Sequence, residues 1–134
     1  MRLIGLDPGL RRIGVALSVG SVALPLAVVE RSNGWIERIR GIVAEYSVDL
    51  IAVGVPLALG GSTTESTLMA RQFIDELTAG IALPVVEVDE RFSSLAAERA
   101  LSASGVSTRK QRGKVDDLAA ADILQRYLDR SMGD

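Results

Sequence analysis

The chain contains 134 residues and has neither cysteine nor histidine. A soft zinc site, an imidazole base and a thiolate nucleophile are therefore all excluded, because each needs one of these two side chains. Acidic oxygens are the best remaining candidates for any chemistry that the protein performs.

Long hydrophobic runs are also missing, since no apolar run reaches ten residues, well short of a membrane span. The N-terminus reaches an acidic residue, Asp7, too early for a signal peptide. Apolar residues make up 48% of the chain and charged residues 24%, which is ordinary for a soluble globular protein. We therefore expect one domain spanning residues 1–134, in a cytoplasmic protein that has no membrane partner.

The hydrophobic patterns predict five strands, three of them consecutive. These strands cover residues 2–6, 13–18, 23–29, 50–53 and 84–88. Four helices are expected: one that Asn33 caps and that runs to about Tyr46, one from about Ser62, one over 94–103 and one over 116–130. The second has capping-box spacing at its start, between Ser62 and Glu65.

The resulting order is β-β-β-α-β-α-β-α-α, which predicts an α/β fold with a five-stranded mixed sheet and helices on both faces. In such a sheet the ends of the two central parallel strands face one crevice. Met69, Phe73 and Leu77 recur at helical spacing, which predicts the buried face of the second helix.

Three carboxylates lie far apart in the sequence, and we expect all three at one edge of the inferred sheet. Asp7 and Glu90 each follow a predicted strand, and Asp116 begins the last predicted helix. A carboxylate beside the core needs compensation, and a divalent metal ion binds carboxylate oxygens well. Each also has a simpler explanation: a turn former for Asp7, an exposed ion pair for Glu90 and a helix cap for Asp116. Asp89 and Asp117 stay open as alternatives to their neighbours.

Positive charge is clustered although the formal net charge is −2. A cluster of this kind is usually a solvated loop, but beside acidic metal ligands it favours binding of a polyanion. The candidates for phosphate contacts are Arg11, Arg12, Arg109, Lys110, Arg112 and Lys114.

Four motifs together resemble the YqgF/RuvX family of RNase H-like nucleases over nearly the whole chain. They lie at residues 5–16 (GLDPGLRRIGVA), 54–57 (GVPL) with 61–62, 89–91 (DER) and 113–116 (GKVD). Pro8 departs from the small or aliphatic residue that is commoner in the family, and makes the first motif similar to that of the RuvC resolvases. The resemblance implies an RNase H-like fold in which Asp7, Glu90 and Asp116 are catalytic and bind Mg²⁺ or Mn²⁺.

For this family the implied activity is metal-dependent hydrolysis of nucleic-acid phosphodiester bonds. The implied role is maturation of the 5′ end of pre-16S rRNA, with resolution of Holliday junctions as the alternative. Structured RNA or branched DNA would be the partner, and junction cleavage by paired incisions would also require a homodimer. The chain has only two Phe, two Tyr and one Trp. Recognition would therefore depend on backbone shape and charge more than on base stacking.

Two other classes of function compete with this hypothesis. A phosphotransferase of the actin and sugar-kinase type has a similar acidic strand-turn-strand opening, but it needs two such domains and this chain supplies one. A nucleic-acid or ribosome-associated module that kept the fold without activity is the other alternative.

Overall fold

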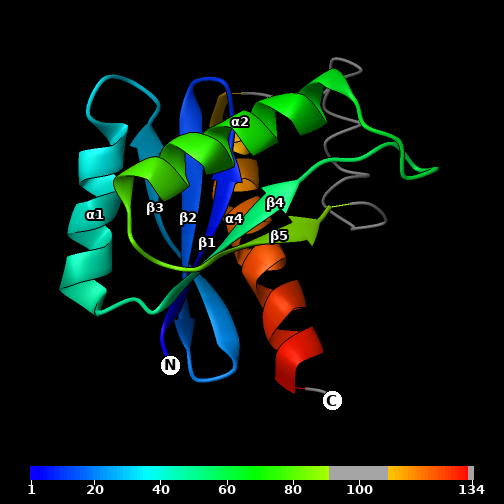
Figure 1. Ribbon diagram of the computed structural model, residues 1–134. Coiled ribbons are helices and arrows are strands. Elements are labelled where there is room, and N and C mark those ends of the chain that lie inside the picture. The colour runs from blue at the N-terminus through cyan, green and yellow to red at the C-terminus, as the bar shows by residue number, and fades with distance from the viewer. Residues whose placement is uncertain (91–108, 133–134) are drawn as a thin grey trace.

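A five-stranded mixed sheet forms the centre of the protein. The computed structural model describes residues 1–90 and 109–132, with side chains up to residue 90 and from 118 to 131. The strands are β1 (Leu3–Pro8), β2 (Arg12–Val19), β3 (Val22–Glu30), β4 (Leu50–Val55) and β5 (Val85–Asp89). The first three form an antiparallel meander, and β4 and β5 run parallel to β1. The order across the sheet is β3-β2-β1-β4-β5 (Figure 1), which confirms the predicted sheet.

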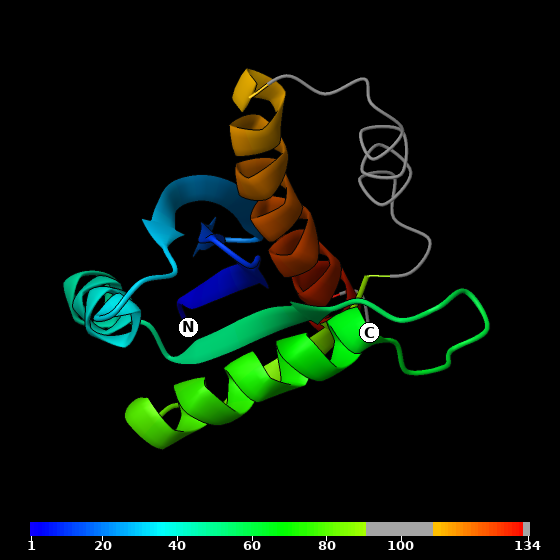
Figure 2. The same ribbon diagram turned by 90° about the horizontal axis from the view of Figure 1, so that it is seen from above.

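Helices cover both faces of this sheet, as the sequence predicts. α1 (Trp35–Tyr46) and α2 (Glu65–Gly80) lie on one face and α4 (Arg109–Met132) on the other, which Figure 2 shows from above. The predicted helix over 94–103 lies outside the described residues. Within the described part of the chain, no helix is long and apolar enough to cross a membrane.

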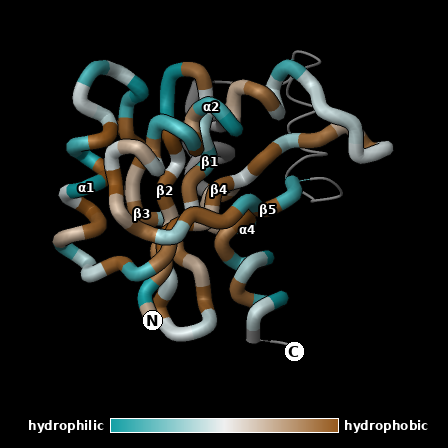
Figure 3. The backbone as a smooth tube through the Cα atoms, in the orientation of Figure 1, coloured by the Kyte–Doolittle hydropathy of each residue, from teal (hydrophilic) through white to brown (hydrophobic). Residues whose placement is uncertain are grey.

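The core has two layers because successive residues of a strand point to opposite faces. Ile4 and Leu6 of β1 belong to the layer under α1 and α2, whereas Leu3 belongs to the layer under α4. The central strands are therefore hydrophobic along almost their whole length (Figure 3), as expected for strands that are buried on both faces. The fully buried side chains of this core include Phe73, Leu77, Ile51, Val53, Ile123 and Leu124.

Two glycines of the sheet allow α4 to pack very closely. A Cβ atom on Gly5 would lie 2.7 Å from Leu124 Cβ and 2.9 Å from the carbonyl oxygen of Ala120. A Cβ atom on Gly54 would lie 2.9 Å from Ile123 Cγ1 and would collide with Cδ1 of the same side chain. The absence of a side chain at Gly5 of β1 and at Gly54 of β4 thus allows α4 to lie this close to the sheet.

Three helix starts differ from the predicted ones. α1 begins after Gly34, which has φ of 91° and makes no side-chain cap, so Asn33 is not the cap. α2 is capped by Thr64 in a reciprocal capping box with Thr67, which replaces the predicted pair Ser62 and Glu65. Thr67 is fully buried and also donates to the carbonyl of Pro56, so this cap is tied to the end of β4.

The third difference concerns α4, which begins at Arg109 instead of Asp116. The basic segment that precedes Asp116 is therefore helical and not a loop. Its lysines and arginines are good helix formers, so a sequence pattern that follows apolar residues alone places the start of the helix too late.

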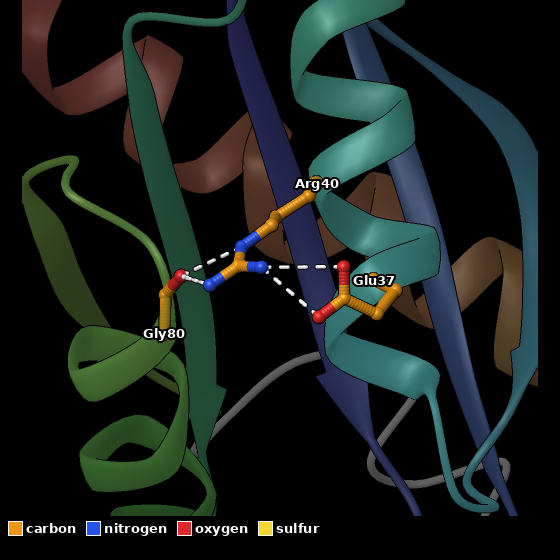
Figure 4. A network of polar contacts seen from close by, with 3 residues as sticks. All are labelled: Glu37, Arg40 and Gly80. Carbon is orange, nitrogen blue, oxygen red and sulfur yellow. Dashed lines mark hydrogen bonds and ion pairs between the residues drawn. The ribbon is translucent and has the colours of Figure 1, made fainter.

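Arg40 joins the two helices that share a face of the sheet. Its Nε and Nη2 donate to the carbonyl of Gly80 at 2.8 and 2.6 Å, and its Nη1 donates to the carboxylate of Glu37 at 3.0 and 3.2 Å (Figure 4). A cation at this point satisfies a terminal carbonyl of α2 and opposes the negative end of the helix dipole.

Candidate active site

Asp7 is the penultimate residue of β1 and is almost fully buried, with 6% of its surface exposed. Leu3 and Gly5 face α4, so the alternation of the strand places Asp7 on the same face. Pro8 ends the strand, and the N–H of Gly9 donates to the carbonyl of Arg12 at 2.8 Å. The predicted Asp-Pro-Gly turn is therefore present, although Asp7 lies inside the strand and not beyond it.

Glu90 directly follows β5 and lies over the end of β4. Its N–H donates to the carbonyl of Val55 at 3.2 Å, and its Cδ lies 3.0 Å from the point that a Cβ atom on Gly54 would occupy. Gly54 therefore makes room both for the carboxylate of Glu90 and for Ile123 of α4. This gives a physical role to the second sequence motif, which begins at this glycine.

Asp7 and Glu90 meet in one pocket, with a volume of about 290 Å³. The other residues that line this pocket are Pro8, Gly9, Leu10, Arg31, Pro56, Ser66, Met69 and Ala70. The strands that bear the two acids are not neighbours in the sheet, because β4 lies between β1 and β5, and β5 is an edge strand. The acids still converge, since β4 ends in Gly54 and Val55 and its next residue, Pro56, is itself part of the pocket lining.

Asp116 lies on α4, within the part of the helix whose side chains are not described. Among the described side chains, no group of three or more acidic residues gathers at one point. Asp117 lies on the same undescribed part, so the choice between these two acids stays a prediction.

Glu90 and Asp89 differ in where they lie. Glu90 lines the pocket, and Asp89 is the last residue of β5, with its carbonyl accepting a hydrogen bond of 2.6 Å from Arg126 Nη1 of α4. Val88 belongs to the layer under α4, so strand alternation sends Asp89 to the opposite face. The contact from Arg126 holds Asp89, the residue directly before Glu90, against α4.

The predicted phosphate-binding residues fall into two groups. Arg11 and Arg12 are exposed in the turn and first residue of β2, directly after the pocket residues Gly9 and Leu10. The other four, Arg109, Lys110, Arg112 and Lys114, lie in the first two turns of α4, where side chains are not described.

Sequence reasoning missed Arg31, which contributes a cationic side chain to the same pocket. Its N–H donates to the carbonyl of Arg11 at 2.8 Å, and its Nη1 donates to the carbonyl of Gly9 at 3.1 Å. The pairing of Arg12 with Glu30 in the β2–β3 ladder places Arg31 beside this turn. That register, had it been predicted, would have identified the residue. Met69, predicted as part of a buried helix face, is only half-buried and lines the pocket as well.

Comparison with known proteins identifies relatives of the chain and its family. The family model described as "RuvX: Holliday junction resolvase" matches residues 1–130. A protein of Geobacillus kaustophilus named "Putative pre-16S rRNA nuclease" is 42% identical, over 96% of this chain and 98% of its own length. A protein of Halothermothrix orenii with the same name is also 42% identical, over 96% and 94% of the two chains.

Solved structures with the same fold include two resolvases. Thermus thermophilus RuvC in complex with a Holliday junction substrate has a TM-score of 0.58 at 20% identity, covering 99% of this chain and 96% of its own. Fowlpox virus resolvase bound to Holliday junction DNA has a TM-score of 0.54 at 12% identity, covering 97% and 98%. These likenesses confirm the RNase H-like fold, and the match over nearly the whole sequence confirms the resemblance drawn from the four motifs: the chain belongs to the RuvX family.

Proposed function

We propose that the protein is a metal-dependent nuclease that hydrolyses phosphodiester bonds of nucleic acid. The observation that carries the proposal is the meeting of Asp7 and Glu90 in one pocket, although they come from different strands. Their carboxylates are hard oxygen donors, which suit Mg²⁺ or Mn²⁺, and the pocket is large enough for hydrated ions. The donor set therefore fits the metals that the family implies.

Asp116 is the proposed third ligand, and the path of α4 supports it. Gln125 of α4 accepts a hydrogen bond of 2.8 Å from the N–H of Ala23. Ala23 pairs with Ser18, and Ser18 accepts a hydrogen bond from Leu3, so this contact lies level with the start of β1. Ala120 and Leu124 lie against Gly5, further along the same strand. α4 thus runs antiparallel to β1, and its earlier residues approach the end of the strand.

The distances along the two elements agree. One helical turn back from Ala120 leads to position 116, a shift of about 5.4 Å. Two residues forward from Gly5 lead to Asp7, a shift of about 6.6 Å in the same direction. This estimate supports Asp116 as the third ligand of the proposed site. Asp117, one residue on, remains the alternative.

Divalent ions held by such carboxylates supply an activated water and stabilise the leaving oxygen of a phosphodiester. The chain's own contribution is to position the ligands. Asp7 is fixed by the β1–β2 ladder, and Glu90 by its hydrogen bond to Val55. Arg11 and Arg12, exposed beside the pocket, would contact backbone phosphates, which gives affinity without sequence selectivity.

The proposed substrate is the 5′ end of pre-16S rRNA. Relatives of about the same length and about 40% identity are named for this RNA, and they match the chain almost from end to end. This role implies action in the cytoplasm. Holliday junctions are the second candidate, because the matching family model is described as a junction resolvase and resolvases bound to junction DNA share the fold. That activity would require two copies of the chain for paired incisions.

One cleavage assay tests both substrates. The purified chain would be incubated with a labelled precursor RNA that spans the 5′ end of 16S rRNA, with a DNA duplex and with a four-way junction, in Mn²⁺, Mg²⁺ or chelator. We expect metal-dependent cleavage that is lost in Asp7→Asn, Glu90→Gln and Asp116→Asn. Asp75→Asn is the matched control, because Asp75 is an exposed acid on α2 that is not among the pocket residues.

The outcomes separate the functions. Cleavage of the RNA at the mature end supports the rRNA role, and paired cuts in the junction by a dimer support the resolvase. Binding without cleavage by wild type and variants alike would overturn the nuclease proposal and favour a non-catalytic module. Hydrolysis of ATP without strand scission would favour the kinase-like alternative.

A further inference from the structure

We infer that Arg31 binds a phosphate of the nucleic-acid backbone at the wall of the acidic pocket. This inference rests on the proposed nuclease function and assigns a role to a residue that none of the four motifs contains. Among the described residues that line the pocket, Arg31 is the one with a positive charge. A nucleic-acid strand that enters this pocket would meet this guanidinium as well as the two acids, Asp7 and Glu90, that would hold the metal ions.

The hydrogen-bonding capacity of Arg31 exceeds what the protein uses. A guanidinium carries five N–H donors, and the side chain makes one hydrogen bond to described residues, from Nη1 to the carbonyl of Gly9. Among the described residues it pairs with the carboxylate of Glu76, at 3.8 Å from Nη2, and this carboxylate is about half exposed. An ion pair of this length at the surface contributes little. Phosphate oxygens are well matched to the remaining donors, because the planar fork of arginine binds them bidentately.

The guanidinium is also held in place before any ligand binds. It lies over the ring of Phe73, 5.1 Å from the ring centroid, and Phe73 is fully buried and stacks on Trp35 with centroids 4.6 Å apart. Only 19% of the Arg31 side chain is exposed. Little side-chain entropy is therefore lost when a phosphate binds, and the cation is poorly hydrated, which strengthens its attraction for an anion.

The rest of the pocket points to backbone recognition. Its described lining holds no aromatic side chain on which a base could stack, and it is mostly proline, glycine and aliphatic residues. Sugar and phosphate are the parts of a nucleotide that such a surface can hold. Arg31 thus contributes affinity that is independent of base sequence.

The test is RNA binding as a function of salt, measured by fluorescence anisotropy with the full chain in Ca²⁺, between about 50 and 200 mM KCl. Arg31→Gln removes the charge but keeps a donor for the carbonyl of Gly9. We expect binding about tenfold weaker, equally for two RNAs of unrelated sequence, and a slope of log affinity against log salt that is smaller by about 0.7. Arg31→Lys keeps the charge and should restore the slope.

Arg40→Gln is the matched control, because Arg40 also donates to a glycine carbonyl but lies outside the pocket. It should leave the salt slope unchanged. Glu76→Gln is a second variant that keeps Arg31 and removes a competing acid, so it should bind RNA at least as tightly as wild type. If Arg31 only supported the turn at Gly9, Arg31→Gln and Arg31→Lys would change the affinity to a similar extent and would both keep the wild-type slope.

The two proposals fail in different ways. A wild-type chain that cleaves RNA with metal, together with an Arg31→Gln variant of unchanged salt slope, overturns the inference on Arg31 and leaves the nuclease intact. A wild-type chain that neither binds nor cleaves nucleic acid overturns both.

Discussion

Replacing Gly54 with alanine tests how closely the site is packed. The new Cβ atom would lie 2.9 Å from Ile123 Cγ1 and 3.0 Å from the carboxyl carbon of Glu90, and would collide with Ile123 Cδ1. Ordinary carbon contacts need about 3.5 Å or more, so the side chains of Ile123 and Glu90 must both move. Overpacking of this kind costs about 1 to 3 kcal/mol, which corresponds to a lowering of Tm by about 3 to 10 °C in a domain of this size.

The same shift should reduce catalysis, because Glu90 is one of the proposed metal ligands. A displacement of even 1 Å at a reacting centre can cost about a hundredfold in rate. We therefore expect Gly54→Ala to be both less stable and less active, with kcat falling more than KM rises. Urea unfolding and metal-dependent cleavage by the same preparation are the two measurements.

A compensating change makes the prediction sharper. Ile123→Val removes Cδ1, the atom that the new Cβ would meet first, and on its own should cost about 0.5 to 1.5 kcal/mol. The double variant should recover part of the stability, with a coupling of about 0.5 kcal/mol or more. Gly41→Ala is the control, because nothing lies within 4 Å of its Cβ position in α1, and alanine there should stabilise by about 0.5 to 1 kcal/mol. Equal stability for Gly54→Ala and wild type, or strictly additive single changes, would refute the packing argument.

Three other predictions follow from the site and from the helix ends. Mn²⁺ at a hundred times its Kd should stabilise the wild type by about 2.7 kcal/mol, seen as a higher Tm, and should raise the Tm of Asp7→Asn much less. Equal shifts in Tm would argue against metal binding at Asp7. Arg40→Ala should lower the unfolding free energy by about 1 kcal/mol in urea melts, because it removes two hydrogen bonds to the end of α2; Glu37→Gln, which breaks only an exposed ion pair, should cost less than half of that. Thr64→Ala should lower the unfolding free energy by about 0.5 to 2 kcal/mol through loss of the cap of α2, whereas Ser62→Ala should be close to neutral. A larger loss for Ser62→Ala than for Thr64→Ala would show that Ser62 is the cap.

The helix boundaries show where local sequence patterns are insufficient. Ser62 and Glu65 have the spacing of a capping box, and so do Thr64 and Thr67, which form the cap that is present. The difference lies in Thr67, whose hydroxyl also reaches Pro56 at the end of β4 and is fully buried there. A buried hydroxyl needs a partner, so a contact with the end of the preceding strand, eleven residues back in the chain, selects one of two locally similar starts.

Much of the protein could be predicted without coordinates, because the patterns involved are local or repeat along the chain. Alternating and continuous apolar runs indicated all five strands and their mixed sheet. The lack of cysteine and histidine pointed to carboxylates, and the four motifs indicated the family. Asp7 and Glu90 were identified as partners from their places after strands, and they do share a pocket.

Features that depend on distances across the sheet could not be read in this way. The role of Gly54 follows from what lies above it, namely Ile123 of α4 and the carboxylate of Glu90. Arg31 lines the pocket because the β2–β3 register carries it back to the turn at Gly9, and nothing in its neighbourhood in the sequence marks it. A sequence pattern records which side chain faces the core. The neighbour that this side chain meets depends on strand order and register, and these are settled when the whole sheet packs between its helices.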